Sequence, residues 1–142
     1  MTEKMWKTAV LIALCWLSIV AVHELDEDER ACVHETGVSE HLVREAKREH
    51  AVFGDNSKYK EFLSCCWKRY GYQDENGEIN WEMVRSVIGR SYNPRVAIKI
   101  INKCMNVKGI TGGDTAVLVL ECLDDHAPNL HTVHHFYSGH KD

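Results

Sequence analysis

The cysteines place the tightest constraint on what this chain can fold into. Six of them occur among 142 residues, and a short secreted chain with this many cysteines is typically a small domain held together by disulfides. The first, Cys15, lies in residues 8–22, an uncharged apolar run that follows two lysines. This run is shorter than the ~20 residues that span a membrane, and it has the form of a secretory signal peptide. We therefore predict that residues 1–21 are removed and that the protein is secreted into extracellular fluid.

Removal of this segment leaves an odd number of cysteines, namely Cys32, Cys65, Cys66, Cys104 and Cys122. One thiol must then be free or paired with another chain. Residues 22–142 should form a single domain, because 44% apolar and 27% charged residues are ordinary values for a globular chain. The net charge of −4 lacks the basic excess that a nucleic-acid or anionic-membrane binder needs. We therefore expect no nucleic-acid partner and no stable membrane insertion.

Apolar residues recur three and four apart along the chain, and no window shows the alternation of a strand, so the fold class predicted is all-α. A compact bundle of about six helices is expected, covering 24–36, 39–49, 57–70, a segment after Asn80, 94–108 and 115–123. Ser39 and Asn80 are suitable N-caps, and Asn93-Pro94 combines a cap with a proline at the first helical position. The last predicted helix is apolar on nearly every side and should lie at the centre of the bundle. A tail follows, at 129–142.

The predicted helices bring the cysteines within reach of one another. Cys104 and Cys122 fall on consecutive helices joined by a glycine-rich turn, so they can bridge. Cys32 can tie the first helix to the third through either Cys65 or Cys66. Loops of this size make each bridge worth about 3–4 kcal/mol in the chain-entropy account. We interpret the bridges as structural.

Three segments of the chain together resemble one family. They are 31–39 around Cys32, 62–80 from the adjacent cysteines into the following loop, and 104–122, which carries Gly-Asp-Thr-Ala at 113–116 between its two cysteines. This pattern resembles the insect odorant-binding and pheromone-binding proteins, the PBP/GOBP family, over most of residues 22–142. Members of that family have six cysteines, and in this sequence Glu61 and Gly113 stand at the second and fifth positions, which are partners in the family.

The resemblance therefore implies the reduced-cysteine (minus-C) subgroup, with bonds from Cys32 to Cys65 and from Cys104 to Cys122. Cys66 then takes the place of an apolar residue, and the helical stripe puts it on the inward face, where a thiol behaves as a small hydrophobe. Two alternatives remain open. Cys66 could instead be the partner of Cys32, with Cys65 free, or it could bridge two chains.

The function implied by the resemblance is that of a carrier. Its ligand would be a small hydrophobic molecule, such as an odorant, a pheromone or a similar semiochemical, held in an internal apolar pocket without any cofactor. A chemosensory receptor is a further candidate partner, and the carrier itself would be a monomer or a weak homodimer. Periodicity alone does not distinguish a solid core from a cavity wall. The expected ligand-binding residues are Leu63, Cys66, Trp67, Tyr70, Val84, Ile88, Ile98, Ile101, Met105, Val119 and Leu123.

The histidines of the tail predict that ligand binding depends on pH. In the family, the segment after the last cysteine can cover or enter the pocket, and here it places His131, His134 and His135 among apolar residues. Histidine gains its charge below about pH 6.5. We expect protonation of these side chains to alter the docking of the tail and to permit pH-dependent release of ligand. A solvated tail without this role is the alternative.

Other functions are expected less. The alternative in another class is a secreted interaction protein, a component of venom or reproductive fluid, that acts through its surface on the same scaffold. An enzyme is not expected, because no pattern of catalytic residues is present.

Neither of two possible metal-binding segments has a suitable set of ligands. The tail histidines lack a carboxylate or cysteine nearby in sequence, and the loop around Gly77 has Tyr72 and Met83 where a calcium loop needs acidic ligands. We therefore assign no metal site.

Overall fold

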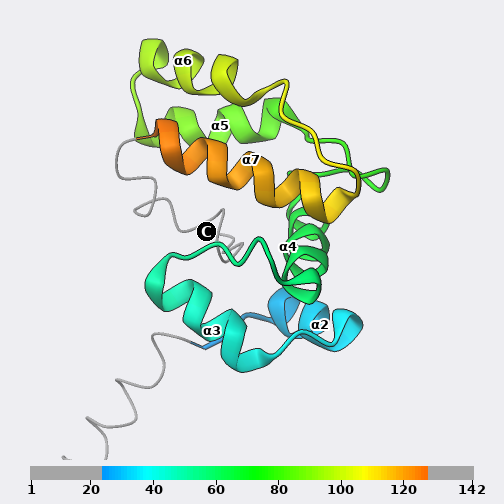
Figure 1. Ribbon diagram of the computed structural model, residues 1–142. Helices are drawn as coiled ribbons and strands as arrows, with labels where there is room; N and C mark the ends of the chain where they lie inside the picture. The colour runs from blue at the N-terminus through cyan, green and yellow to red at the C-terminus, as the bar shows by residue number, and fades with distance from the viewer. Residues whose placement is uncertain (1–23, 128–142) are drawn as a thin grey trace, which may run out of the picture.

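The structure, a computed structural model, describes residues 24–127. Their regular secondary structure consists of α-helices joined by loops (Figure 1). The predicted all-α fold is confirmed, and an isolated bridge between Gln73 and Ile79 is the strand-like pairing recorded in this range. The predicted signal peptide and the tail lie outside the described residues. The helices are α2 (Glu27–Thr36), α3 (Glu40–Glu49), α4 (Ser57–Tyr70), α5 (Trp81–Ser91), α6 (Pro94–Cys104) and α7 (Gly112–His126).

Side chains that satisfy free backbone N–H groups define where these helices begin. Asp26 and Glu29 form a reciprocal capping box at α2, and Thr111 and Asp114 form another at α7. The caps expected at Ser39, Asn80 and Asn93 are all present. At the other end, α2 and α4 stop at glycines with positive φ, Gly37 at 69° and Gly71 at 83°.

Two long helices, α4 and α7, form the centre of the bundle (Figure 1). They pack against each other, α2 packs on α4, α6 packs on α7, and α5 packs on α6. The expectation that α7 lies centrally is confirmed, since Ala116, Val119, Leu120 and Leu123 have no exposed surface. In Figure 1, α2 and α3 lie toward the lower end of α4, and α5 and α6 lie above α7.

Helix α6 differs from its prediction in length and in orientation. It ends at Cys104 instead of near residue 108, and Val107 N–H closes a turn on the Cys104 carbonyl as the chain bends back toward α7. Its buried face consists of Ala97, Ile100, Ile101 and Cys104. The prediction that Ile98 and Met105 point inward is therefore wrong, since these side chains are 52% and 45% exposed. Ile98 lies one residue off the buried stripe, and Met105 comes after the last helical residue.

Two disulfides join pairs of helices. Cys32–Cys65 links α2 to α4, and Cys104–Cys122 links α6 to α7. This pairing is the one implied by the resemblance. Cys66 is free and only 4% exposed. The alternatives in which Cys66 pairs with Cys32 or reaches another chain do not fit this arrangement.

The contact between α4 and α7 lies where the resemblance puts the missing third bridge. A Cβ at Gly113 would lie 2.9 Å from the carbonyl carbon and oxygen of Lys60, so the two backbones touch beside Glu61. Lys60 Nζ also donates a hydrogen bond to the Asp114 carboxylate at 2.8 Å. Hydrogen bonds from Lys60 and Thr111 lower the pKa of Asp114 to about 2. This ion pair therefore stays charged down to strongly acidic pH, and it ties together the two helices that lack the family's disulfide.

Candidate functional site

The side chains expected to line a ligand site meet in the interior. All of those expected from α4, α5 and α7 are buried, and from α6 Ile101 is buried, whereas Ile98 and Met105 are exposed. The buried ones belong to one continuous hydrophobic cluster. Four different helices thus supply one apolar region, as a single internal site requires. The residues in question are Leu63, Cys66, Trp67, Tyr70, Val84, Ile88, Ile101, Val119 and Leu123.

Aromatic rings form one side of this interior. Trp67 packs edge-on against Tyr72, with ring centroids 5.9 Å apart, and Tyr70 lies 6.4 Å from the same ring. The periodicity of α4 identified Trp67 and Tyr70. It missed Tyr72, which is 5% exposed, because this residue follows Gly71 outside the helix, where the helical repeat no longer applies. The wall is therefore built from a helix and from the loop that follows it.

A buried carboxylate lies beside the same wall. Glu29 on α2 has no exposed surface. Its Oε2 accepts hydrogen bonds from Asp26 N–H and from Lys47 Nζ, both at 2.8 Å. Its Oε1 is buried and has no hydrogen-bond partner. Burial, which disfavours the charged form, raises the pKa of Glu29 despite the ammonium of Lys47.

Polar groups of α4 interact with the acidic side chains at the start of α2. The Tyr70 hydroxyl donates to the Asp26 carboxylate, at 3.2 Å from each oxygen. Burial raises the pKa of the Cys66 thiol, and the charges of Glu29 and Asp26 raise it further. The pKa of Tyr70 is raised by the same causes. Cys66 is thus held as a neutral thiol, whereas a nucleophilic cysteine needs a thiolate.

Sequence reasoning missed the site that Glu29 forms, although a signal for it exists. Asp26 and Glu29 have the three-residue separation of a capping box, and Glu29 precedes Cys32 by the same separation. Residues three apart share a helix face. Because Cys32 must face α4 to form its disulfide, Glu29 must face α4 as well. The acidic residues at the start of α2 also favour the helix dipole, which by itself predicts exposed carboxylates and no buried one.

A small open cleft of about 250 Å³ is lined by the exposed Met105 among polar and apolar side chains. Two larger open clefts lie on the surface, apart from this interior. One, of about 720 Å³, runs between α4 and the start of α7 and is lined largely by charged and polar side chains, including Lys60, Lys68 and Glu75. The other, of about 630 Å³, contains Ile110 and Leu118 beside Lys108. None of the expected ligand-binding residues lines either cleft. Neither therefore has the lining of an apolar binding site.

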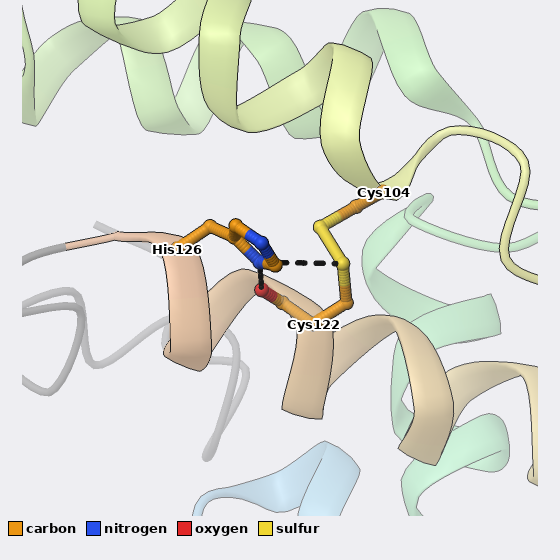
Figure 2. Close-up of side chains that lie close together, drawn as sticks. All are labelled: Cys104, Cys122 and His126. Atoms are coloured by element: carbon orange, nitrogen blue, oxygen red, sulfur yellow. Dashed lines mark hydrogen bonds between the residues drawn. A yellow bond between two sulfur atoms is a disulfide. The ribbon is translucent and has the colours of Figure 1, made fainter.

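One cluster within residues 24–127 has the composition of a metal site. Figure 2 shows Cys104, Cys122 and His126, whose ligand atoms lie within 4.8 Å of one another. The two sulfurs are bonded to each other at 2.10 Å, and His126 Nδ1 lies 2.8 Å from the Cys122 carbonyl oxygen and 3.7 Å from its sulfur. Metals bind the thiolate form of cysteine. The cluster in this state is a structural staple that joins α6 to α7.

No helix within residues 24–127 is long and apolar enough to cross a membrane. The histidines expected to sense pH, His131, His134 and His135, lie outside the described residues. The site that the structure presents is therefore the helical interior together with the buried polar groups at its α2 side.

Comparison with known proteins agrees with this geometry. No curated protein matches the chain. Residues 20–126 match the PBP/GOBP family, and this match covers every described helix. Its members carry odorants and pheromones and are binding proteins, not enzymes. The chain therefore belongs to the PBP/GOBP family.

Proposed function

We propose that this protein is a secreted carrier that holds one small hydrophobic molecule, an odorant, pheromone or similar semiochemical, inside the helical bundle. The observation that carries the proposal is the convergence of apolar side chains from α4, α5, α6 and α7 on one interior region. Each CH₂ group of a ligand buried there gains about 0.8 kcal/mol. Two disulfides, Cys32–Cys65 and Cys104–Cys122, support assignment to the reduced-cysteine subgroup and suit an extracellular fluid. In this proposal residues 1–21 are the signal peptide and residues 22–142 are the carrier.

Enlarging an interior side chain should abolish binding of an apolar dye. We expect the wild type to bind N-phenylnaphthylamine with a blue-shifted emission, and Val119→Phe to lose at least roughly tenfold in affinity, because the added ring occupies space that the ligand needs. The matched control is Leu118→Phe, the neighbouring residue on α7, whose side chain is 40% exposed. Circular dichroism checks that both variants remain folded. Absence of dye binding to the folded wild type, or equal losses in the two variants, would contradict an interior site.

We propose also that ligand affinity falls at acidic pH through the tail, residues 129–142, in which protonation would charge His131, His134 and His135. The ion pair of Asp114 cannot supply this effect, because its pKa of about 2 lies far below the pH range concerned. Dye titrations at pH 7.4 and 5.0 should show weaker binding at the lower pH for residues 22–142, and no such difference after deletion of 129–142. Equal affinities at both pH values would refute the role of the tail, as would a difference that survives the deletion.

A further inference from the structure

The buried Glu29 oxygen without a partner requires an explanation. Nearly all buried polar atoms in proteins are hydrogen-bonded, because leaving one without a partner costs the free energy of its lost hydration. Within residues 24–127, the other oxygen of this carboxylate is fully engaged, by Asp26 N–H and Lys47 Nζ, whereas Oε1 has neither a partner nor contact with solvent. The structure thus leaves one buried acceptor of this carboxylate open to a group that is not among its present partners.

The location of Glu29 points to a ligand as that group. The Cys32–Cys65 disulfide holds α2 against α4 with Cα atoms 5.7 Å apart. Glu29 is one helical turn before Cys32, and its charge acts on the Cys66 thiol and the Tyr70 hydroxyl. Both of these residues belong to the proposed ligand-binding set. The unpartnered oxygen thus belongs to a buried carboxylate on the helix that the disulfide holds against α4, the helix that supplies these two residues.

The charge balance determines what kind of ligand group fits. Among the described residues, the charged side chains that act on Glu29 are the carboxylate of Asp26 and the ammonium of Lys47, which approaches from α3. Tyr70 already donates its hydroxyl proton to Asp26. One cation thus faces two carboxylates, so a further donor is favoured here and a further acceptor is repelled. An aldehyde or ester carbonyl would place its oxygen against a carboxylate oxygen.

Resting on the carrier function proposed above, we infer that Glu29 Oε1 is the polar anchor of the interior and accepts a hydrogen bond from the hydroxyl of an otherwise apolar alcohol. The anchor selects alcohols over aldehydes and acetate esters with the same hydrocarbon chain. The hydrocarbon lies along the aromatic and aliphatic side chains of α4, and the hydroxyl points to α2.

The test compares displacement of the dye by a linear alcohol, the corresponding aldehyde and the corresponding acetate. We expect the wild type to bind the alcohol roughly tenfold more tightly than the acetate, the size of effect typical of a hydrogen bond to a charged group. In Glu29→Gln this ratio should fall to within about threefold. The side-chain amide can turn its N–H toward the ligand and donate a hydrogen bond to the carbonyl oxygen of the aldehyde or the acetate. Glutamine still completes the capping box with Asp26, so α2 is preserved.

The matched control is Glu27→Gln, an exposed glutamate in the first turn of the same helix, which should keep the wild-type ratio. A comparison on the wild type alone adds a test that does not depend on the folding of a variant: the alcohol should bind more tightly than its methyl ether. Equal affinity for alcohol, acetate and ether would overturn the anchor and leave the carrier function intact. So would an unchanged ratio in folded Glu29→Gln. Failure of every compound, and of the dye, to bind the wild type would overturn both proposals.

Discussion

Replacing Trp67 by alanine should lower the free energy of unfolding by about 3–5 kcal/mol, the usual cost of removing a large aromatic side chain from a core. Trp67 is 1% exposed and is among the largest fully buried side chains of the described chain. Trp67 lies on α4, which packs against both α2 and α7. The cavity left by the substitution would therefore weaken the packing at the centre of the bundle.

Urea denaturation followed by circular dichroism measures this loss. The matched control is Trp81→Ala, at the first turn of α5, where the same side chain is only half-buried and should cost clearly less. Addition of a tightly bound ligand should restore part of the stability of folded Trp67→Ala, because a ligand that binds only the native state shifts the equilibrium toward it. Equal losses for the two tryptophans would show that Trp67 is not part of the main packed interior.

The sequence predicted the helices best where local chemistry defines their ends. Asn93-Pro94 marked the start of α6 correctly, since both residues act within the first turn. The end of α6 was predicted too late, because the residues after Cys104 remain compatible with a helix and only the return of the chain toward α7 ends it. The same limit explains Ile98. Its apolar neighbours in the sequence are compatible with an inward position for Ile98. The way in which α6 packs against α7 buries Ile100 instead and leaves Ile98 exposed.

The polar part of the site was hidden for a different reason. A rule that assigns apolar residues to the interior places every glutamate at the surface, and α2 begins with three acidic residues in its first turn. What buries Glu29 is a tertiary arrangement: the Lys47 ammonium arrives from α3, and the disulfide draws α2 onto α4. The family resemblance could supply a cavity in general terms, but it could not reveal which polar atom borders it.

The spacing of the cysteines along the sequence does not determine which of the two adjacent cysteines, Cys65 or Cys66, pairs with Cys32. Helical placement alone left Cys65 and Cys66 as equal partners for Cys32, since both lie near the same turn of α4. The structure separates them by face. Cys65 is half-exposed and bonded to α2, whereas Cys66 is buried among the interior side chains. This difference leads to a direct test by removing each sulfur in turn.

Removing the Cys32–Cys65 bridge with the double substitution Cys32→Ala and Cys65→Ala should cost about 3–4 kcal/mol, because the unfolded chain regains the freedom of a loop of that length. The Cys104–Cys122 bridge closes a shorter loop, with a separation of 18 residues against 33. Its double alanine variant should therefore lose about 0.5 kcal/mol less by the same relation. Urea unfolding under non-reducing conditions measures both losses, and mass spectrometry of proteolytic peptides identifies the remaining bridge.

Cys66→Ala is the control that separates the two adjacent cysteines. It removes one buried sulfur and no bridge, so its loss should be well below that of either double variant, about 1 kcal/mol. The thiol of the wild type should also resist alkylation until the protein unfolds, because Cys66 is buried and its raised pKa keeps it protonated. A loss in Cys66→Ala as large as that of the double variants, or rapid alkylation of one thiol in the native protein, would assign the bridge to Cys66 and free Cys65. In that case α4 would be rotated against α2, and the placement of Glu29 beside α4, on which the proposed anchor rests, would change as well.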